Sequence, residues 1–162
     1  MVDKLAKEAA LKEGPIAYPK IPREVLTTRE KEYGLNMWQK QWKNTGKGAV
    51  TKSIFPSVRS RLQTDIPIFP GLTAMVTGHG NTRSYLHRFG FNNNPKCPCD
   101  DREDQTIQHL IVQCTKLTAQ RNELIKQIQQ TGGTWPMANA NFVSDYLPIF
   151  VKFIKSIDFA HL

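Results

Sequence analysis

The sequence predicts a mainly α-helical protein, with little or no sheet, built around a small domain that a metal ion staples together. Several segments are rich in strong helix formers or repeat apolar residues at helical spacing. All three cysteines fall between residues 97 and 114, with a histidine among them. A disulfide scaffold normally uses an even number of cysteines spread along the chain, so this clustering favours a metal site.

Length and composition limit the other possibilities. At 162 residues and 40% apolar content, the chain can form one modest core, or two small units joined by a linker. No apolar run is long enough to span a bilayer, and the first residues lack the apolar block of a signal peptide. We therefore expect an intracellular protein, in the nucleus and cytoplasm, with no membrane partner.

The net charge of +8 is unevenly distributed. Residues 1–94 hold fifteen Lys or Arg and seven Asp or Glu, whereas residues 95–162 hold seven of each, and no acidic residue lies between Glu32 and Asp65. Such a basic stretch favours a polyanion, because each phosphate contact releases counterions. The alternative is a solvated basic surface. The candidate nucleic-acid-binding residues are Lys40, Lys43, Lys47, Lys52, Arg59, Arg61, Arg83 and Arg88.

The N-terminal half divides at its prolines and glycines. Residues 3–13 predict a helix that Gly14-Pro15 ends, and the proline-rich residues that follow predict a linker. Residues 28–43 predict a helix interrupted or entered near Gly34. Trp38 and Trp42 share one face of it, which indicates packing first and a base-stacking platform second. The turn at 44–48 lacks the full phosphate-loop pattern, so we expect no small-molecule substrate there.

Short elements are expected in the middle of the chain. We predict a helix from Val58 to Gln63, an apolar stretch over 72–77 and a sharp break at Gly78-His79-Gly80. Asn81 or Thr82 can cap the next helix, which we expect to carry Tyr85, Leu86 and Phe89 inward.

Cys97, Cys99, His109 and Cys114 are the predicted metal ligands. Three thiolates and one imidazole satisfy tetrahedral Zn²⁺ with no open position, which predicts one structural zinc ion without a catalytic water. Three buried thiols and a core histidine brought together by chance are the alternative. Asp104 can cap a helix that carries His109. Positions five apart on a helix point about 140° apart, so we expect this helix to end or distort at Cys114.

The loop between the first thiolates and that helix is acidic. Its carboxylates would repel phosphate, so the knuckle either contacts nucleic acid or only staples the fold. A further helix is expected near 116–130, capped by Thr115 and stopped by Gly132-Gly133.

The last predicted helix, over 142–158, carries a continuous apolar face. Pro148 should kink this helix or mark its first turn. The face either closes the core over the tryptophans or stays exposed and binds another protein. The predicted divisions of the chain are 1–13, 14–27 (linker), 28–94 (basic helical segment), 95–131 (knuckle and following helix) and 132–162 (C-terminal helix).

Taken together, these motifs resemble the region after the ribonuclease H domain of insect non-LTR retrotransposon polyproteins. Within these, the motifs resemble the jockey-like and related ribosomal-DNA-inserting groups. The resemblance covers most of residues 33–125 and depends on the order of the matching residues, which are Trp38, Trp42, Gly46, Lys47, Gly48, Pro56, Thr77 to Gly80, Tyr85, Leu86, Phe89, Cys97, Cys99, His109 and Cys114.

The resemblance implies a role as well as a fold. Such polyproteins are reverse transcriptases with an endonuclease, so this chain would be an accessory zinc-knuckle domain that positions template RNA or target DNA beside the other polyprotein domains. By resemblance to the last helix of ribonuclease H domains, Asp3 would be a remnant metal-binding carboxylate. One carboxylate cannot hold a metal pair, so we identify no complete active site here. The alternative function is a protein-docking module, such as a domesticated retroelement fragment.

Overall fold

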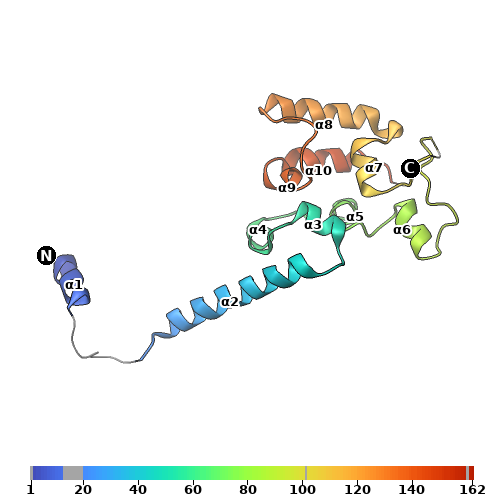
Figure 1. Ribbon diagram of the computed structural model, residues 1–162. Coiled ribbons are helices and arrows are strands. Elements are labelled where there is room, and N and C mark those ends of the chain that lie inside the picture. Colours follow the sequence, from blue (N-terminus) through green and yellow to red (C-terminus); the bar gives the residue numbers. More distant parts are fainter. Residues whose placement is uncertain (1, 13–19, 101, 160) are drawn as a thin grey trace. The chain divides into compact units, whose positions relative to one another are not determined.

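A computed structural model describes residues 2–12, 20–100, 102–159, 161 and 162 (Figure 1). The chain divides into two units, Met1–Asn36 and Met37–Leu162. None of the helices in the described ranges is both long enough and apolar enough to cross a membrane. The helical elements, in chain order, are α1 (Val2–Leu11), α2 (Arg23–Asn44), α3 (Ala49–Ile54), α4 (Val58–Gln63), α5 (Pro70–Thr77), α6 (Arg83–Arg88), α7 (Ile107–Val112), η1 (Thr115–Leu117), α8 (Thr118–Gln130), α9 (Asn141–Ser144) and α10 (Leu147–Lys155).

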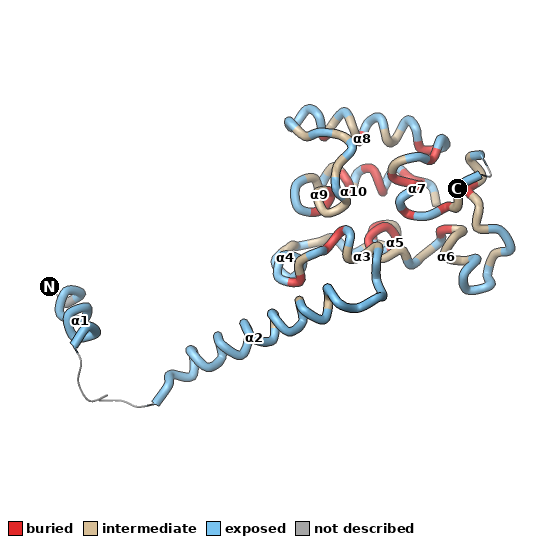
Figure 2. Tube along the Cα trace, viewed as in Figure 1, coloured by how far each residue is buried: buried red, intermediate tan, exposed pale blue. Residues whose placement is uncertain are grey.

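The predicted fold class is confirmed. The described residues are mainly helical, and their one strand-like pairing is an isolated antiparallel bridge between Lys96 and Asp104. Figure 2 shows where the chain is buried: the buried residues belong to the second unit, and none of the described residues of the first unit is buried.

The helices of the N-terminal region differ partly from the prediction. The first helix is found as α1, while residues 13–19, which hold its predicted stop and the first part of the predicted linker, lie outside the described residues. The next helix, α2, begins at Arg23 rather than at residue 28 and continues through Gly34 without a break. The carbonyl of Pro22 accepts from the amides of the following residues, which starts the helix early. A single glycine costs a helix only about 1 kcal/mol, which the long helix tolerates.

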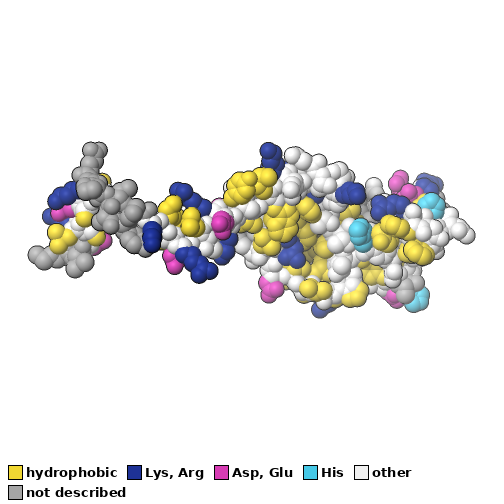
Figure 3. Space-filling view, turned by 90° about the horizontal axis from the view of Figure 1, so that it is seen from below, with side chains coloured by type: hydrophobic (Ala, Val, Ile, Leu, Met, Phe, Trp, Pro, Cys, Tyr) yellow, Lys and Arg dark blue, Asp and Glu magenta, His cyan; other side chains and the backbone are white. Residues whose placement is uncertain are grey.

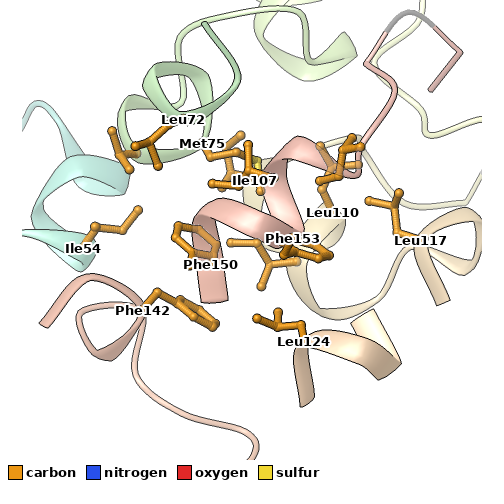
Figure 4. Close-up of a cluster of buried hydrophobic side chains, with 14 of the residues drawn as sticks. Ile54, Leu72, Met75, Ile107, Leu110, Leu117, Leu124, Phe142, Phe150 and Phe153 are labelled. Atoms are coloured by element: carbon orange, nitrogen blue, oxygen red, sulfur yellow. The ribbon is translucent and has the colours of Figure 1, made fainter. Parts of the chain in front are cut away.

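The core of the second unit lies around α10. In Figure 1, α8 lies on one side of α10 and α9, and α3 and α5 lie on the other, in agreement with the packing of α10 against α5, α8 and α9. Figure 4 shows Phe150 at the middle of this core, and its ring stacks on that of Phe142 with the centroids 4.8 Å apart. Burial of these side chains is the main stabilising contribution to the fold.

The C-terminal segment forms two helices instead of the one predicted over 142–158. The carbonyl of Asn141 accepts from the amides of both Asp145 and Tyr146, which ends α9. Pro148 then lies in the first turn of α10, as predicted, because a proline there lacks only an amide that the helix does not use.

The apolar face of α10 is buried against α5 and α8. The prediction that it closes over the tryptophans is therefore wrong, as is the alternative of an exposed docking face. Phe150, Phe153 and Ile154 recur at helical spacing and fill the core between these helices, which leaves no free apolar stripe on α10.

The short helices before the cysteines are set by their caps. The predicted helix Val58–Gln63 is confirmed as α4, and the Ser57 hydroxyl accepts from the amide of Ser60. Of the two predicted caps for α6, Thr82 performs the role. The break before it needs glycine, because a Cβ on Gly80 would lie 2.6 Å from the Cβ of Ala74. Phe89 was expected inward and is instead 52% exposed, since the helix ends there.

The helices around the cysteines use other caps than predicted. The hydroxyl of Thr106 caps α7 by accepting from the amide of His109, while Asp104 pairs with Lys96 at 2.9 Å. Thr115 opens the 3-10 turn η1 and is not the cap of α8. The predicted stop is confirmed, because α8 ends at Gln130, just before Gly132 in the left-handed region at φ 84°.

Replacing Phe150, which has no exposed surface, with alanine tests the position of the core. We expect Phe150→Ala to lower the free energy of unfolding by about 3–5 kcal/mol, because a cavity replaces the ring. Phe91→Ala, at a ring that is 79% exposed, is the matched control and should change it by no more than about 0.5 kcal/mol. Denaturant unfolding followed by circular dichroism measures both, and equal losses would contradict this packing.

Candidate metal centre

Cys97, Cys99, His109 and Cys114 converge from a loop, a helix and the residue that follows the helix. Cys97 and Cys99 lie in a loop whose ends are held together, since the amide of Cys97 donates to the carbonyl of Glu103 at 2.8 Å. His109 projects from α7, and Cys114 follows that helix. In the part of the chain that the structure describes, these four side chains form the candidate metal-binding group.

The geometry of the four ligand atoms suits one metal ion. All four lie within 4.8 Å of one another. The Sγ atoms of Cys97 and Cys114 are 3.7 Å apart, and the Sγ of Cys99 is 3.3 Å from Nε2 of His109. Tetrahedral zinc with bond lengths of about 2.3 Å to sulfur and about 2.0 Å to nitrogen places two sulfur atoms about 3.8 Å apart and a sulfur and a nitrogen about 3.5 Å apart. The residues present therefore fit a tetrahedral ion.

The end of α7 brings Cys114 back to His109. The carbonyl of His109 accepts from the amides of both Gln113, at 2.9 Å, and Cys114, at 2.8 Å. The second of these bonds spans five residues, so the chain leaves the regular helix at this point. This confirms the prediction that the helix ends or distorts before Cys114, which a regular helix would direct away from His109.

Burial disfavours the charged thiolate form of the cysteines in the cluster. Cys97 and Cys114 have no exposed surface, and burial raises the pKa of the Cys99 and Cys114 thiols. Bound thiolates therefore need a compensating cation, which a divalent metal ion supplies. Nδ1 of His109 is buried without a hydrogen-bond partner, so Nε2, which faces Cys99, is the atom placed to bind an ion.

Arg121 joins α8 to the cluster, and the sequence analysis missed it. Its guanidinium donates to the carbonyl of Ile111 at 3.1 Å and to the carbonyl of Cys114. Burial lowers the pKa of Arg121, and the nearby Cys114 and Cys99 oppose that shift. Three thiolates and one dication leave one negative charge, which the guanidinium complements. The sequence feature that could have revealed Arg121 is its position as a cation within the apolar stripe of Leu117, Leu124 and Ile128.

Gln105 joins α6 to the cluster, and it too was missed. This side chain is only 1% exposed. Its Oε1 accepts from the amide of Arg83 at 2.9 Å, and its Nε2 donates to the Sγ of Cys97 at 3.8 Å. A buried amide that satisfies partners on both sides fixes the start of α6 relative to the first ligand.

Two acidic side chains of the loop between Cys99 and α7, those of Asp100 and Asp104, have partners nearby in the sequence. Asp100 accepts from the amide of Arg102 at 3.1 Å, which lowers the pKa of that carboxyl. Asp104 pairs with Lys96, and Asp101 lies outside the described residues. Asp3, the suggested remnant carboxylate, is exposed on α1 and pairs with Lys7 at 3.0 Å, and it joins no candidate metal group among the described residues.

The predicted nucleic-acid-binding residues of the second unit occupy α2, the following turn, α3, α4 and α6. Six of them are exposed, and Lys52 and Arg83 are half-buried. Lys52 donates to the carbonyl of Thr45, Arg61 lies over the ring of Phe55, and Arg88 lies over the rings of Tyr85 and Phe89. The eight residues are Lys40, Lys43, Lys47, Lys52, Arg59, Arg61, Arg83 and Arg88.

The tryptophans Trp38 and Trp42 line an apolar pocket together with side chains from α3, α4 and α5. The indole of Trp42 donates to the carbonyl of Phe55 at 2.8 Å, which supports the packing interpretation for that residue. Trp38 is 49% exposed at the edge of the pocket. Figure 3 shows hydrophobic side chains gathered on this face of the second unit, with Lys and Arg side chains near them.

The fold and the cluster define a class of protein: a small helical domain with a candidate three-cysteine, one-histidine metal centre. The chain is 34% identical over 82 residues to the retrovirus-related Pol polyprotein from type-1 retrotransposable element R1 of Bradysia coprophila. The match covers 49% of this chain and 8% of that polyprotein. No protein-family model and no solved structure matches the chain. The similarity supports a retrotransposon-related origin, while the jockey-like grouping and the predicted divisions of the chain stay predictions.

Arg121→Met tests the link between α8 and the cluster. We expect it to lower the free energy of unfolding by about 1–3 kcal/mol, because two carbonyls lose their donor. Lys126→Met, at an exposed cation on the same helix, removes the same charge and should stay within about 0.5 kcal/mol of the parent. Thermal unfolding compares them, and an equal effect of the two variants would show that Arg121 makes no specific link.

Proposed function

We propose that this chain is a nucleic-acid-binding zinc domain of a retrotransposon-type reverse transcriptase polyprotein, where it helps to position template RNA or target DNA. The observation that carries the proposal is the metal-ligand cluster in a chain whose preceding segment is basic and free of acidic residues from 33 to 64. The similarity to the R1 Pol polyprotein supports the context. Its partners would be RNA or DNA and the other domains of such a polyprotein.

Zinc is the ion that this donor set favours. Three thiolates and one imidazole in a closed tetrahedral arrangement are typical of structural zinc sites, whereas Mg²⁺ and Ca²⁺ prefer oxygen ligands. With all four positions taken by side chains, none remains for a water molecule or a substrate. We therefore assign the ion a structural role.

The metal cluster and the basic segment would have different roles in binding. The acidic loop beside Cys99 disfavours phosphate near the cluster, while Lys40, Lys43 and Lys47 lie in a stretch that attracts it. In this proposal the zinc ion holds the fold, and the basic segment supplies most of the affinity through phosphate contacts.

A protein-docking module is the second candidate function. The apolar pocket beside Trp38 favours it, because exposed apolar surface of this kind can receive another protein. The buried face of α10 no longer supports it. Binding of the chain to the separately purified polymerase domain of such a polyprotein, lost on Trp38→Ser and unaffected by salt, would favour docking over nucleic-acid binding.

Zinc content tests the metal assignment. We expect about one zinc ion per chain in the parent, and loss of most of it in Cys97→Ser and His109→Ala, because each removes one of four ligands. His87→Ala, at an exposed histidine outside the cluster, is the matched control and should retain the ion. Elemental mass spectrometry of the purified proteins measures this, and equal zinc in parent and Cys97→Ser would overturn the assignment.

A salt titration tests nucleic-acid binding. The logarithm of the association constant should fall linearly with the logarithm of salt concentration, with a slope of about −0.9 per phosphate contact on duplex DNA. The double variant Lys40→Gln, Lys43→Gln should reduce that slope by about 2 and weaken binding.

The control for this titration carries the same change of charge elsewhere. Lys126→Gln with Lys152→Gln alters two exposed lysines on α8 and α10 and should leave both the slope and the affinity nearly unchanged. Fluorescence anisotropy with labelled oligonucleotides gives the affinities. No detectable binding to RNA or DNA at low salt would refute the proposed function.

A further inference from the structure

Helix α6 and the residues around it carry aromatic rings at the surface. The rings of Tyr85 and Phe89 lie 4.8 Å apart, and that of His79 lies 5.2 Å from Tyr85. The guanidinium of Arg88 lies 5.0 Å from the centroid of Phe89 and 6.0 Å from that of Tyr85. We call His79, Tyr85, Arg88 and Phe89 the α6 aromatic patch. Toward the right of Figure 3, on the side where Figure 1 places α6, hydrophobic, basic and histidine side chains gather, with acidic side chains next to them.

The local fold directs these rings outward. Tyr85 and Phe89 are four residues apart, and Arg88 follows Tyr85 by three, so all three side chains share one side of the helix end. The chain then turns at Gly90, in the left-handed region at φ 75°, and the amide of Phe91 donates back to the carbonyl of Leu86 at 2.9 Å. Phe89 consequently remains 52% exposed where an inward helix face would have buried it.

The segment that carries the patch is basic. No Asp or Glu occurs from residue 66 to residue 99, a stretch that contains Arg83 and Arg88, and its Lys96 is paired with Asp104. Exposed aromatic rings in a positive field suit a ligand that combines flat rings with negative charge. Nucleotides have this combination, because each base offers a face for stacking and each phosphate meets a cation.

We propose that the α6 aromatic patch binds unpaired bases of a single-stranded polynucleotide. A base stacks on the exposed ring of Phe89, and Arg83 and Arg88 meet the flanking phosphates. The proposal rests on the proposed function. It adds which residues contact the nucleic acid and that the nucleic acid is single-stranded. Bases in a duplex already stack on one another, so a duplex would gain little from these rings.

The metal cluster fixes the position of this patch. Arg83, the first residue of α6, donates its amide to Gln105, whose side chain also reaches the Sγ of Cys97. Thr82, only 3% exposed, caps the same helix through its hydroxyl. The start of α6, and with it the patch, is therefore linked to Cys97 through Gln105.

Three substitutions at Phe89 in the full chain separate stacking from other roles. The probes are single-stranded oligo(dT) and oligo(U) of about 15 nucleotides, within the size range of small single-strand-binding domains, and a DNA duplex of the same length. We expect Phe89→Leu, which keeps apolar bulk and loses the aromatic face, to weaken single-strand binding about tenfold. Phe89→Tyr and Phe89→Trp should stay within about twofold of the parent, because both keep a stacking face.

Duplex binding and an exposed aliphatic control complete the test. Phe89→Leu should change duplex affinity by less than about twofold, and Leu62→Ala, at a side chain on α4 that is 57% exposed, should change neither affinity. Equal losses for Phe89→Leu and Phe89→Tyr, equal losses on single strand and duplex, or no loss at all would each overturn the proposal. A loss on only one of oligo(dT) and oligo(U) supports it and identifies the strand that is bound.

The failures of the two proposals can be told apart. In one result, the parent chain binds duplex or single strand with a steep salt dependence while substitutions of Phe89 leave the affinity unchanged. That result refutes the aromatic site alone. A parent chain that binds no polynucleotide at low salt refutes the proposed function together with this inference. Unchanged zinc content and circular dichroism in every variant exclude misfolding as the cause of a loss.

Discussion

The loop with Cys97 and Cys99, the short helix α7 with His109, and Cys114 just after that helix meet at one candidate metal centre. Helix α7 has six residues, well below the length at which an isolated helix forms in water. The loop before it is closed by few backbone hydrogen bonds. The cluster brings the loop and helix together, Gln105 extends the connection to α6, and Arg121 extends it to α8. The cluster therefore adds links to α6 and α8 beyond those of the apolar core around α10.

Local sequence signals predicted the helical class and several elements, but not their tertiary arrangement. Helix α4 was predicted to the residue, and the structure adds that the Ser57 hydroxyl caps it. The break between α9 and α10 was missed, since the apolar period runs across both helices and only the backbone at Asp145 and Tyr146 separates them. Phe89 was expected inward because helical spacing alone does not reveal that the helix ends there. Which helices α10 packs against also depends on distant contacts.

The candidate site was more predictable in its ligands than in its supports. The four ligands follow from residue type and spacing, and the structure brings their atoms within 4.8 Å of one another. Arg121 and Gln105 act through bonds to backbone and sulfur atoms that lie 7–22 residues away, and no short motif encodes them. The same arrangement suggests how the domain works as a whole. Zinc would hold a scaffold from which basic and aromatic side chains on α2 to α6 face a polynucleotide.

The central claim is that one zinc ion occupies the three-cysteine, one-histidine cluster. X-ray absorption at the zinc edge of the purified full chain tests it most directly, because the spectrum counts the ligand atoms and gives their distances. The account predicts three sulfur atoms at about 2.3 Å and one nitrogen at about 2.0 Å. A shell of oxygen or nitrogen atoms without sulfur, or a chain that holds no zinc, would contradict it.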